Sequence, residues 1–266
     1  MIYVYTSLLN GWDNLRPPAT PADEFVRYIC FTNVPNLPRV YPWEYRPAYA
    51  AGDACRSVRV PKILPHLMLP EDAEYSIYHD GNFQLRQDPH TVIGHLLSRH
   101  QWAAHKHPCR NCLYEEAEVI LEDPGMAGWR AQKPEEERIE PIRREIARYR
   151  AEGFPEHAGL WANGMIVRRH TPEVARLNEL WWEHFSAGCE RDQISFPAAR
   201  AKAGLEIRTI PENIWASPWI LFHWHAAFKT REDNPDFWPE RSRIRQRLAD
   251  LARLTGSTGG IAYPEY

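Results

Sequence analysis

The sequence lacks several features that would place it in a common class of protein. Its 266 residues contain no apolar run of about 18 residues, the length that a membrane-spanning helix requires. The N-terminus has neither a basic start nor a cleavage site, so no signal peptide is expected. A cytoplasmic location is therefore expected. A net charge of −3 gives no reason to expect a polyanionic partner such as a nucleic acid.

The sequence has few cysteines, and their number is odd. Five cysteines in a chain of this length argue against a disulfide framework. Cys109 and Cys112 have the spacing of a zinc-binding pair, but no second pair follows, so reduced thiols are expected. The chain also lacks a GxSxG and an HExxH sequence, which would indicate a serine hydrolase or a zinc peptidase.

What the sequence does contain is an alternation of strand and helix patterns. Strands are predicted at 2–6, 28–32, 74–79, 102–105 and 165–169. Helices are predicted at 49–67 with breaks at Pro61 and Pro65, and at 89–99, 114–121, 135–150, 172–184, 191–203 and 239–254. Thr171 and Pro172 supply an N-cap and a first-turn proline. This alternation predicts one α/β domain, residues 1–238, with a central, mostly parallel sheet flanked by helices. A C-terminal amphipathic helix and loose tail, 239–266, complete the chain.

The main candidate for a site is the turn Asp80-Gly81-Asn82, which follows a predicted strand. Ligands of α/β folds bind at the carboxyl ends of the strands. Oxygen-bearing side chains on both sides of a glycine can hold one hard cation, such as Mg²⁺ or Mn²⁺. The same residues are among the commonest in tight turns, and by themselves they favour a plain turn.

A second candidate lies near the C-terminus. His223 and His225 point the same way if their segment is a strand, and either imidazole could complete a metal site. Lys229 could offset phosphate charge. Partly buried histidines in an aromatic cluster are an equally good interpretation of the same residues.

Three further groups of polar residues have both functional and plain interpretations. Asp192 and Gln193 open a helix, where they could hold sugar hydroxyls or act as a cap. The mixed charges of the segment 106–118 could line a pocket or form surface ion pairs. Arg56 and Lys62 could contact a diphosphate, or lie on a solvated helix face.

Eight short segments, in this order, resemble a known family. The match runs from about residue 1 to 230 and includes Tyr5-Thr6 with Gly11-Trp12-Asp13, and the segments 28–32, 59–66, 80–82, 106–108, 114–117, 168–170 and 191–196. Together they resemble the glycosyltransferase-like family that includes plant mucilage-related rhamnogalacturonan galacturonosyltransferases and many bacterial proteins.

The resemblance implies a single GT-A-like (Rossmann-like) domain with an Asp-containing metal motif after a central strand. More distantly, the chain is similar to glycogenin-type retaining galactosyltransferases, whose metal motif aligns with Asp80-Gly81-Asn82. Their Asn-x-Gly strand motif has a shorter counterpart in Asn163-Gly164, and their histidine and lysine have the spacing of His223 and Lys229. Asn82 replaces a carboxylate, and the glycines of the histidine motif are absent, so His225 competes with His223 as a ligand.

The expected activity is metal-dependent transfer of a sugar from a nucleoside-diphosphate sugar, with uridine diphosphate as the expected nucleotide, to an acceptor hydroxyl with retention. The implied cofactor is Mn²⁺ or Mg²⁺. Asp192 would bind donor hydroxyls and Gln193 would lie near the anomeric carbon. The expected metal ligands are Asp80, Asn82, His223 and His225. The expected nucleotide-sugar contacts are Tyr5, Thr6, Arg56, Lys62, His107, Arg110, Asn163 and Lys229.

Two other functions remain open at this point. One is a hydrolase acting on a lipid or a glycoside, and the other is a non-catalytic carbohydrate-binding protein of the same fold. The sequence names neither the sugar, nor the acceptor, nor the oligomeric state, because selectivity among nucleotide sugars depends on a few pocket contacts.

Overall fold

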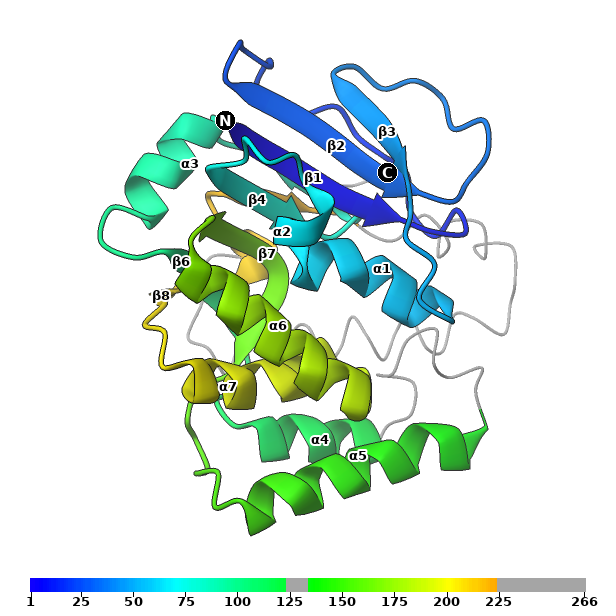
Figure 1. Ribbon diagram of the computed structural model, residues 1–266, viewed down its shortest axis with the longest axis vertical. Helices are drawn as coiled ribbons and strands as arrows, with labels where there is room; N and C mark the ends of the chain where they lie inside the picture. Colours follow the sequence, from blue (N-terminus) through cyan, green and yellow to red (C-terminus); the bar gives the residue numbers. More distant parts are fainter. Residues whose placement is uncertain (123–133, 224–266) are drawn as a thin grey trace.

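A seven-stranded sheet forms the centre of the molecule (Figure 1). The computed structural model describes residues 1–122 and 134–223. The strands lie in the order β3-β2-β1-β4-β7-β6-β8, and β7 is the one antiparallel member among them. This confirms the predicted α/β class with a mostly parallel sheet. The strands are β1 Ile2–Leu8, β2 Val26–Thr32, β3 Trp43–Pro47, β4 Tyr75–His79, β6 Trp102–Lys106, β7 Trp161–Arg169 and β8 Arg208–Ile210.

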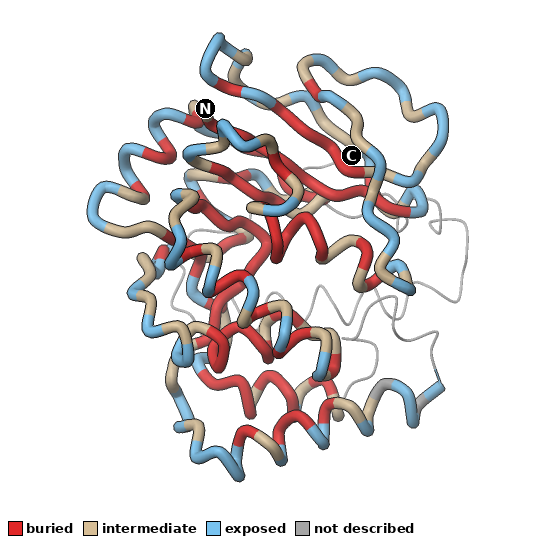
Figure 2. The backbone as a smooth tube through the Cα atoms, in the orientation of Figure 1, coloured by how far each residue is buried: buried red, intermediate tan, exposed pale blue. Residues whose placement is uncertain are grey.

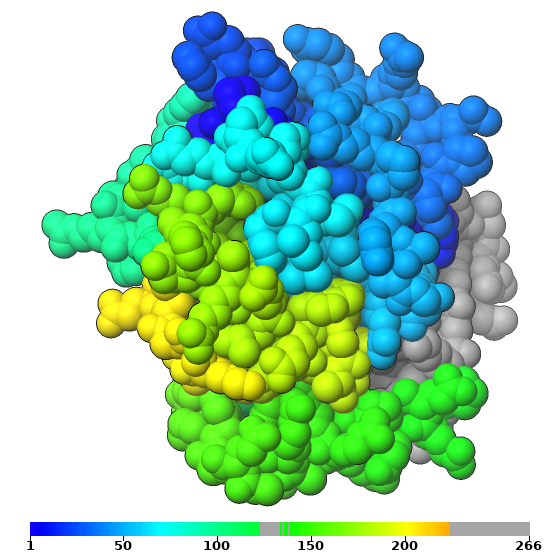
Figure 3. Space-filling model, viewed as in Figure 1, coloured from blue at the N-terminus to red at the C-terminus, as the bar shows by residue number. Residues whose placement is uncertain are grey.

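Helices cover both faces of this sheet. Because neighbouring strand residues point to opposite faces, Tyr3 and Tyr5 pack toward α1, α6 and α7, whereas Ile2 and Val4 pack toward α3. Figure 3 shows α1, α2, α6 and α7 covering the near face. The helices are α1 Ala54–Ile63, α2 Pro65–Met68, α3 Pro89–Leu96, α4 Leu113–Glu122, α5 Glu135–Ala151, α6 Pro172–Ala187, α7 Asp192–Ala203 and the 3₁₀ turn η2 Ile214–Ala216.

A small second sheet pairs two distant segments. β5, Phe83–Leu85, lies antiparallel to β9, Ile220–Phe222. β5 follows directly after the turn at Asp80, so this pairing brings residue 223 beside the turn.

No helix in residues 1–122 or 134–223 is long and apolar enough to cross a bilayer.

Several predicted boundaries are confirmed and others are wrong. The Thr171 hydroxyl caps α6 by accepting from Val174 N at 3.3 Å, as predicted. Pro61 does not break α1, because Val60, Pro61 and Ile63 are buried and their packing offsets the one lost backbone hydrogen bond. The chain instead leaves α1 at Leu64, before Pro65, where a residue preceding proline disfavours helix.

β1 is longer than predicted, and this changes the position of two expected site residues. It continues to Leu8, which pairs with Thr32 of β2, so Tyr5 and Thr6 lie within the strand and not at its end. The Tyr5 hydroxyl accepts a hydrogen bond from Arg168 Nη1 at 2.7 Å, and both Tyr5 and Thr6 are fully buried. The prediction that Tyr5 and Thr6 lie at the end of the strand is therefore wrong.

β7 is irregular where it passes the turn. Ala104 of β6 pairs with Ile166, but the next residue, His105, pairs with Ala162. This shift leaves Asn163 and Gly164 outside the β6 ladder, as a bulge does. The Gly164 carbonyl accepts from Asp80 N at 2.9 Å, so the irregular segment lies directly against the turn.

An aromatic cluster lies between the sheet and α6–α7. Figure 2 shows that the central strands and parts of these helices are buried. The Phe196 ring lies 5.5 Å from Trp102, 5.5 Å from Trp161 and 4.8 Å from Trp181, measured between ring centroids. Phe196, Trp102 and Trp181 are fully buried. This cluster fixes α7, and with it the N-terminus of α7, against the sheet.

Replacing this central ring tests the packing. Phe196→Ala should lower the free energy of unfolding by about 3–5 kcal/mol, because it removes buried contacts and leaves a cavity. Leu67→Ala, at a side chain that is 67% exposed, should change it by less than about 0.5 kcal/mol. Urea denaturation followed by tryptophan fluorescence measures both, and equal losses would contradict the proposed role of the cluster.

Candidate active site

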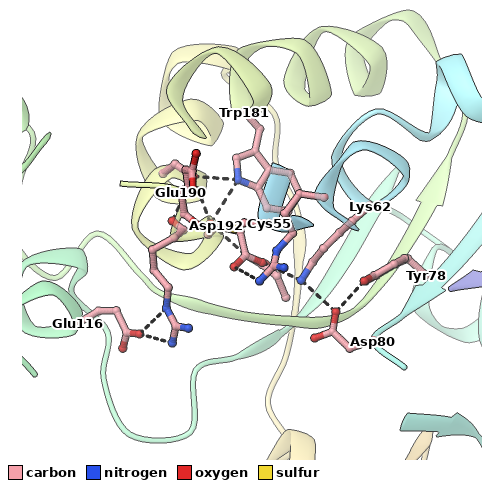
Figure 4. A network of polar contacts seen from close by, with 12 residues as sticks. Cys55, Lys62, Tyr78, Asp80, Glu116, Trp181, Glu190 and Asp192 are labelled. Carbon is pink, nitrogen blue, oxygen red and sulfur yellow. Dashed lines mark hydrogen bonds and ion pairs between the residues drawn. The ribbon is translucent and has the colours of Figure 1, made fainter. Parts of the chain in front are cut away.

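The site begins at Asp80, at the carboxyl end of β4. Its Oδ1 accepts from the Tyr78 hydroxyl at 2.7 Å and from Lys62 Nζ at 3.2 Å (Figure 4). The Asp80 side chain is nevertheless 38% exposed. One oxygen of this carboxylate is thus anchored by two donors while the group still faces solvent.

Lys62 connects Asp80 to a second carboxylate. Its Nζ lies 2.7 Å from Asp192 Oδ2, and the two side chains are 2% and 5% exposed. Arg59 approaches the other oxygen, with Nη2 at 3.6 Å from Asp192 Oδ1. Burial alone would raise the pKa of Asp192, but the Lys62, Arg59 and Arg191 charges outweigh it and hold this pKa well below its usual range.

The start of α7 holds Asp192 in place. Its backbone carbonyl accepts from Trp181 Nε1 at 3.2 Å and from Asn163 Nδ2 at 3.3 Å. Asp192 is also the first residue of α7, where a negative charge is favoured by the helix dipole. Asn163 from β7 and Asp192 from α7, far apart in sequence, are therefore neighbours.

A second buried carboxylate, Glu116 of α4, is held by two arginines. Arg110 lies 2.6 Å from Glu116 Oε2, and Arg191 lies 2.7 Å from Glu116 Oε1. Burial would raise the pKa of the fully buried Glu116, but the arginine charges, Arg191 first, lower it. His107, 3.6 Å from Glu116, accepts backbone hydrogen bonds at Nδ1 from Cys109 and Arg110. Burial lowers the pKa of His107 to about 4.

The loop between α6 and α7 is fixed from behind by Glu145 of α5. This buried carboxylate accepts from Cys189 N at 2.8 Å and from the Tyr149 hydroxyl at 2.8 Å. Gly188 lies against this carboxylate, because a Cβ at this position would collide with it unless the Glu145 side chain moved. The next residue but one, Glu190, accepts from Arg56 Nε at 2.5 Å. The loop is therefore preset before any ligand binds.

The loop after β1 lies against the turn after β4. A Cβ on Gly81 would collide with Leu8 and would lie 3.2 Å from Asp13 Oδ2. Asp13 is 7% exposed, and Asn82 is 6% exposed. The Asn82 carbonyl accepts from His223 N at 2.8 Å. Strand order reverses between β1 and β4, which is where open α/β sheets bind their ligands.

The structure brings together four of the predicted residues: Lys62, Asp80, Asn163 and Asp192. Arg56 lies on the same helix as Lys62 but is paired with Glu190 and the Ser186 carbonyl. The predicted residues His107 and Arg110 gather around Glu116, and Gln193 follows Asp192 at the start of α7.

The metal ligands predicted near the C-terminus are only partly described. His223 lies beside Asn82 through its backbone, and its imidazole Nε2 is 3.2 Å from Gln84 Oε1. His225 and Lys229 lie outside the described residues, as does the predicted helix 239–254. Within residues 1–122 and 134–223, no group of three or more His, Cys, Asp and Glu side chains has the geometry of a metal site.

Two residues of this region were not predicted as site residues. Arg59 is three residues after Arg56 and three before Lys62, a spacing that could have placed it on the same helix face. The sequence indicates Asp13 less clearly, since its position beside Gly81 depends on how the loop after β1 folds.

Comparison with known families decides the relationship. Residues 48–212 match the model of the TOD1/MUCI70 glycosyltransferase-like domain. The chain belongs to this family. The resemblance seen in the sequence is therefore confirmed. The matched region contains α1, β4, β7 and the start of α7, and so it includes Asp80, Lys62 and Asp192.

Individual relatives are more distant. The chain is 28% identical over 156 residues to the "Probable hexosyltransferase MUCI70" of Arabidopsis thaliana, covering 57% of this chain. It spans about a quarter of that protein, 26% of its length. Among solved structures, mouse xyloside xylosyltransferase 1 in its apo form matches with a TM-score of 0.44 at 11% identity, over 79% of this chain and 85% of that one.

The buried lysine should matter more to stability than its partly exposed neighbour. Lys62→Met leaves Asp192 buried with one cation fewer and should cost about 3 kcal/mol of unfolding free energy. Arg56→Met, at a side chain that is 39% exposed, should cost about 1 kcal/mol or less. Urea denaturation at neutral pH measures both losses. If the two variants lost the same stability, Lys62 would not hold the network together.

His107 should make the fold sensitive to acid in a defined window. Its pKa is about 4 in the fold against about 6.5 in the unfolded chain, so between these pH values the unfolded chain binds the extra proton. Stability should therefore fall as the pH drops from 6.5 to 4, by up to about 1.4 kcal/mol per pH unit from this group. His107→Gln should flatten the measured slope of unfolding free energy against pH in this window. An unchanged slope would mean that folding does not shift the pKa of His107.

Proposed function

We propose that this chain transfers a hexose from a nucleoside-diphosphate sugar, with uridine diphosphate as the nucleotide, to an acceptor hydroxyl with retention at the anomeric carbon. Family membership supports the class of reaction. The observation that carries the rest is Asp80, a partly exposed carboxylate at the end of β4, anchored by Tyr78 and Lys62 where the strand order reverses.

The side chains around the turn have the donor chemistry that suits a hard divalent cation, Mn²⁺ or Mg²⁺. Asp80, Asn82 and Asp13 offer carboxylate and amide oxygens, the ligand type that such ions prefer. Asp80 and Asn82 would hold the ion, with His223 or His225 as the nitrogen ligand and Asp13 supplying further negative charge beside Gly81. The ion would supply charge neutralisation at the departing diphosphate.

The basic residues of α1 would face the diphosphate. Lys62 is fixed by Asp80 and Asp192, so its ammonium is positioned without further ordering. Lys229 would add a charge from the C-terminal segment. Asp192 and Asn163 would orient the sugar, and Gln193 would lie near the anomeric carbon.

The state of Asp192 supports retention. Its two oxygens already face Lys62 and Arg59, and its pKa is held low, which makes it a weak base and a poor nucleophile. A route in which the leaving diphosphate itself assists the acceptor on the same face of the sugar therefore suits this site better than a covalent glycosyl intermediate.

A direct assay tests this function. The protein is incubated with Mn²⁺ and a panel of uridine-diphosphate hexoses, and release of uridine diphosphate is measured with and without sugar acceptors. Asp80→Asn should lower turnover by about a hundredfold or more, because the cation loses its carboxylate ligand. Asp23→Asn, at an exposed ion pair with His90, is the control and should leave turnover unchanged.

Each other result has a defined meaning. Release of free sugar with no transfer to any acceptor would indicate a hydrolase, and binding without release would indicate a carbohydrate-binding protein. If no nucleotide sugar bound with or without metal, and Asp80→Asn changed nothing, the proposed function would be wrong. Proton NMR of the glycoside formed would show whether the anomeric configuration is retained.

A further inference from the structure

Three cations on α1 face the acidic side chains that precede and begin α7. Arg56, Arg59 and Lys62 follow one another at intervals of three residues, which keeps them on one side of the helix. Arg56 meets Glu190, while Arg59 and Lys62 both meet Asp192. The three cations have the same spacing in the sequence. They differ in how many of their N–H donors form hydrogen bonds with the protein.

Arg56 and Lys62 are satisfied by the protein. Arg56 donates to the Glu190 carboxylate at 2.5 Å and to the Ser186 carbonyl at 3.2 Å. Lys62 lies 2.7 Å from Asp192 and 3.2 Å from Asp80. These distances are those of charged hydrogen bonds.

Arg59 is different. Within residues 1–122 and 134–223, its ion pair is with Asp192 Oδ1 at 3.6 Å, beyond hydrogen-bonding distance. Its Nε is buried and has no hydrogen-bond partner within the described part of the chain. A guanidinium carries five N–H donors in a planar fork, and leaving such donors unused in a largely buried position is costly. Asp192 holds the charge of Arg59 in place without using its hydrogen bonds.

The Arg59 guanidinium also stays protonated. Burial alone would lower its pKa, but neighbouring anionic groups, Asp192 first, outweigh burial and raise it. Asp80 is among these groups, so Arg59 lies within the field of the carboxylate at the end of β4. Its side chain is 20% exposed, so the residue is not sealed from solvent.

We infer that Arg59 is the anion-binding residue of this site and takes the phosphate oxygens of a nucleoside diphosphate in a forked pair of hydrogen bonds. This inference rests on the proposed function and assigns to Arg59, ahead of Arg56, the contact with the leaving group. A guanidinium fork matches two oxygens of one phosphate, which a lysine ammonium does not. In addition to its proposed contact with the sugar, Asp192 then points both Arg59 and Lys62 at the ligand.

Binding of uridine diphosphate, measured by titration calorimetry in the presence of Mn²⁺, tests this assignment. Arg59→Gln should weaken binding by about tenfold or more, as expected for loss of charged hydrogen bonds. Arg59→Lys keeps the charge beside Asp192 and should keep the fold, but it lacks the fork and should bind with intermediate affinity. Arg56→Gln should weaken binding less than Arg59→Gln does. Arg46→Gln, at a surface ion pair with Glu44, is the control and should bind as the unmodified protein does.

Binding of uridine, which lacks phosphate, distinguishes a lost phosphate contact from a damaged fold. Arg59→Gln should lower affinity for uridine diphosphate and leave affinity for uridine unchanged, and its thermal unfolding midpoint shows whether the fold is intact. Equal loss for both ligands would overturn the inference, as would a change within twofold for uridine diphosphate or a larger loss in Arg56→Gln. If the unmodified protein bound no nucleoside diphosphate at all, the proposed function would fail, and this inference with it.

Discussion

The ammonium group of Lys62, placed between the Asp80 and Asp192 carboxylates, is the interaction on which the site depends. It joins α1, the end of β4 and the start of α7 at one buried point. Two carboxylates brought this close without a cation between them would repel each other in a medium that screens poorly. The backbone of Lys62 is itself fixed, because its carbonyl accepts from Arg168 Nη2 at 2.7 Å and the same guanidinium reaches Tyr5 in the sheet. The position of α1 on the sheet and the charge arrangement of the site are therefore set together.

The distribution of charge is uneven in a way that suits an anionic ligand. Two buried carboxylates of the region, Asp192 and Glu116, are each faced by two cations, whereas Asp80, which is partly exposed, shares the lysine of Asp192. Several cations thus lie close to a partly exposed acid. A diphosphate accompanied by a divalent cation would complete this arrangement, the anion facing the arginines and the cation facing Asp80. The pairs concerned are Asp192 with Lys62 and Arg59, and Glu116 with Arg110 and Arg191.

The sequence was informative where local chemistry decides structure and uninformative where packing decides it. The α/β alternation, the Thr171 cap and the turn at Asp80 follow from patterns within a few residues, and each could be predicted. The strands β5 and β8 are three residues long, too short for a periodicity to show. β3 is an edge strand with one buried residue in five, so it carries little hydrophobic pattern. The meeting of Arg59 with Asp192 depends on how α6 and α7 pack against α1 through the aromatic cluster. No spacing in the sequence records that packing, and for the same reason the burial of Tyr5 inside β1 was not foreseen.

The strong stabilisation of ionised Asp192 has a consequence for the proposed reaction. A carboxylate whose pKa is held far below neutral keeps its charge throughout the physiological range and does not accept a proton from an acceptor hydroxyl. Glu116 is in the same state for the same reason. Both buried acids are therefore weak bases, poorly suited to take the proton of the acceptor hydroxyl. In the proposed transfer, the bond between the anomeric carbon and the phosphate oxygen breaks, the acceptor oxygen bonds to that carbon, and its proton passes to the departing phosphate. Under this scheme the contribution of the protein is a fixed field, in which Arg59 and Lys62 stabilise the phosphate charge that grows as the bond breaks.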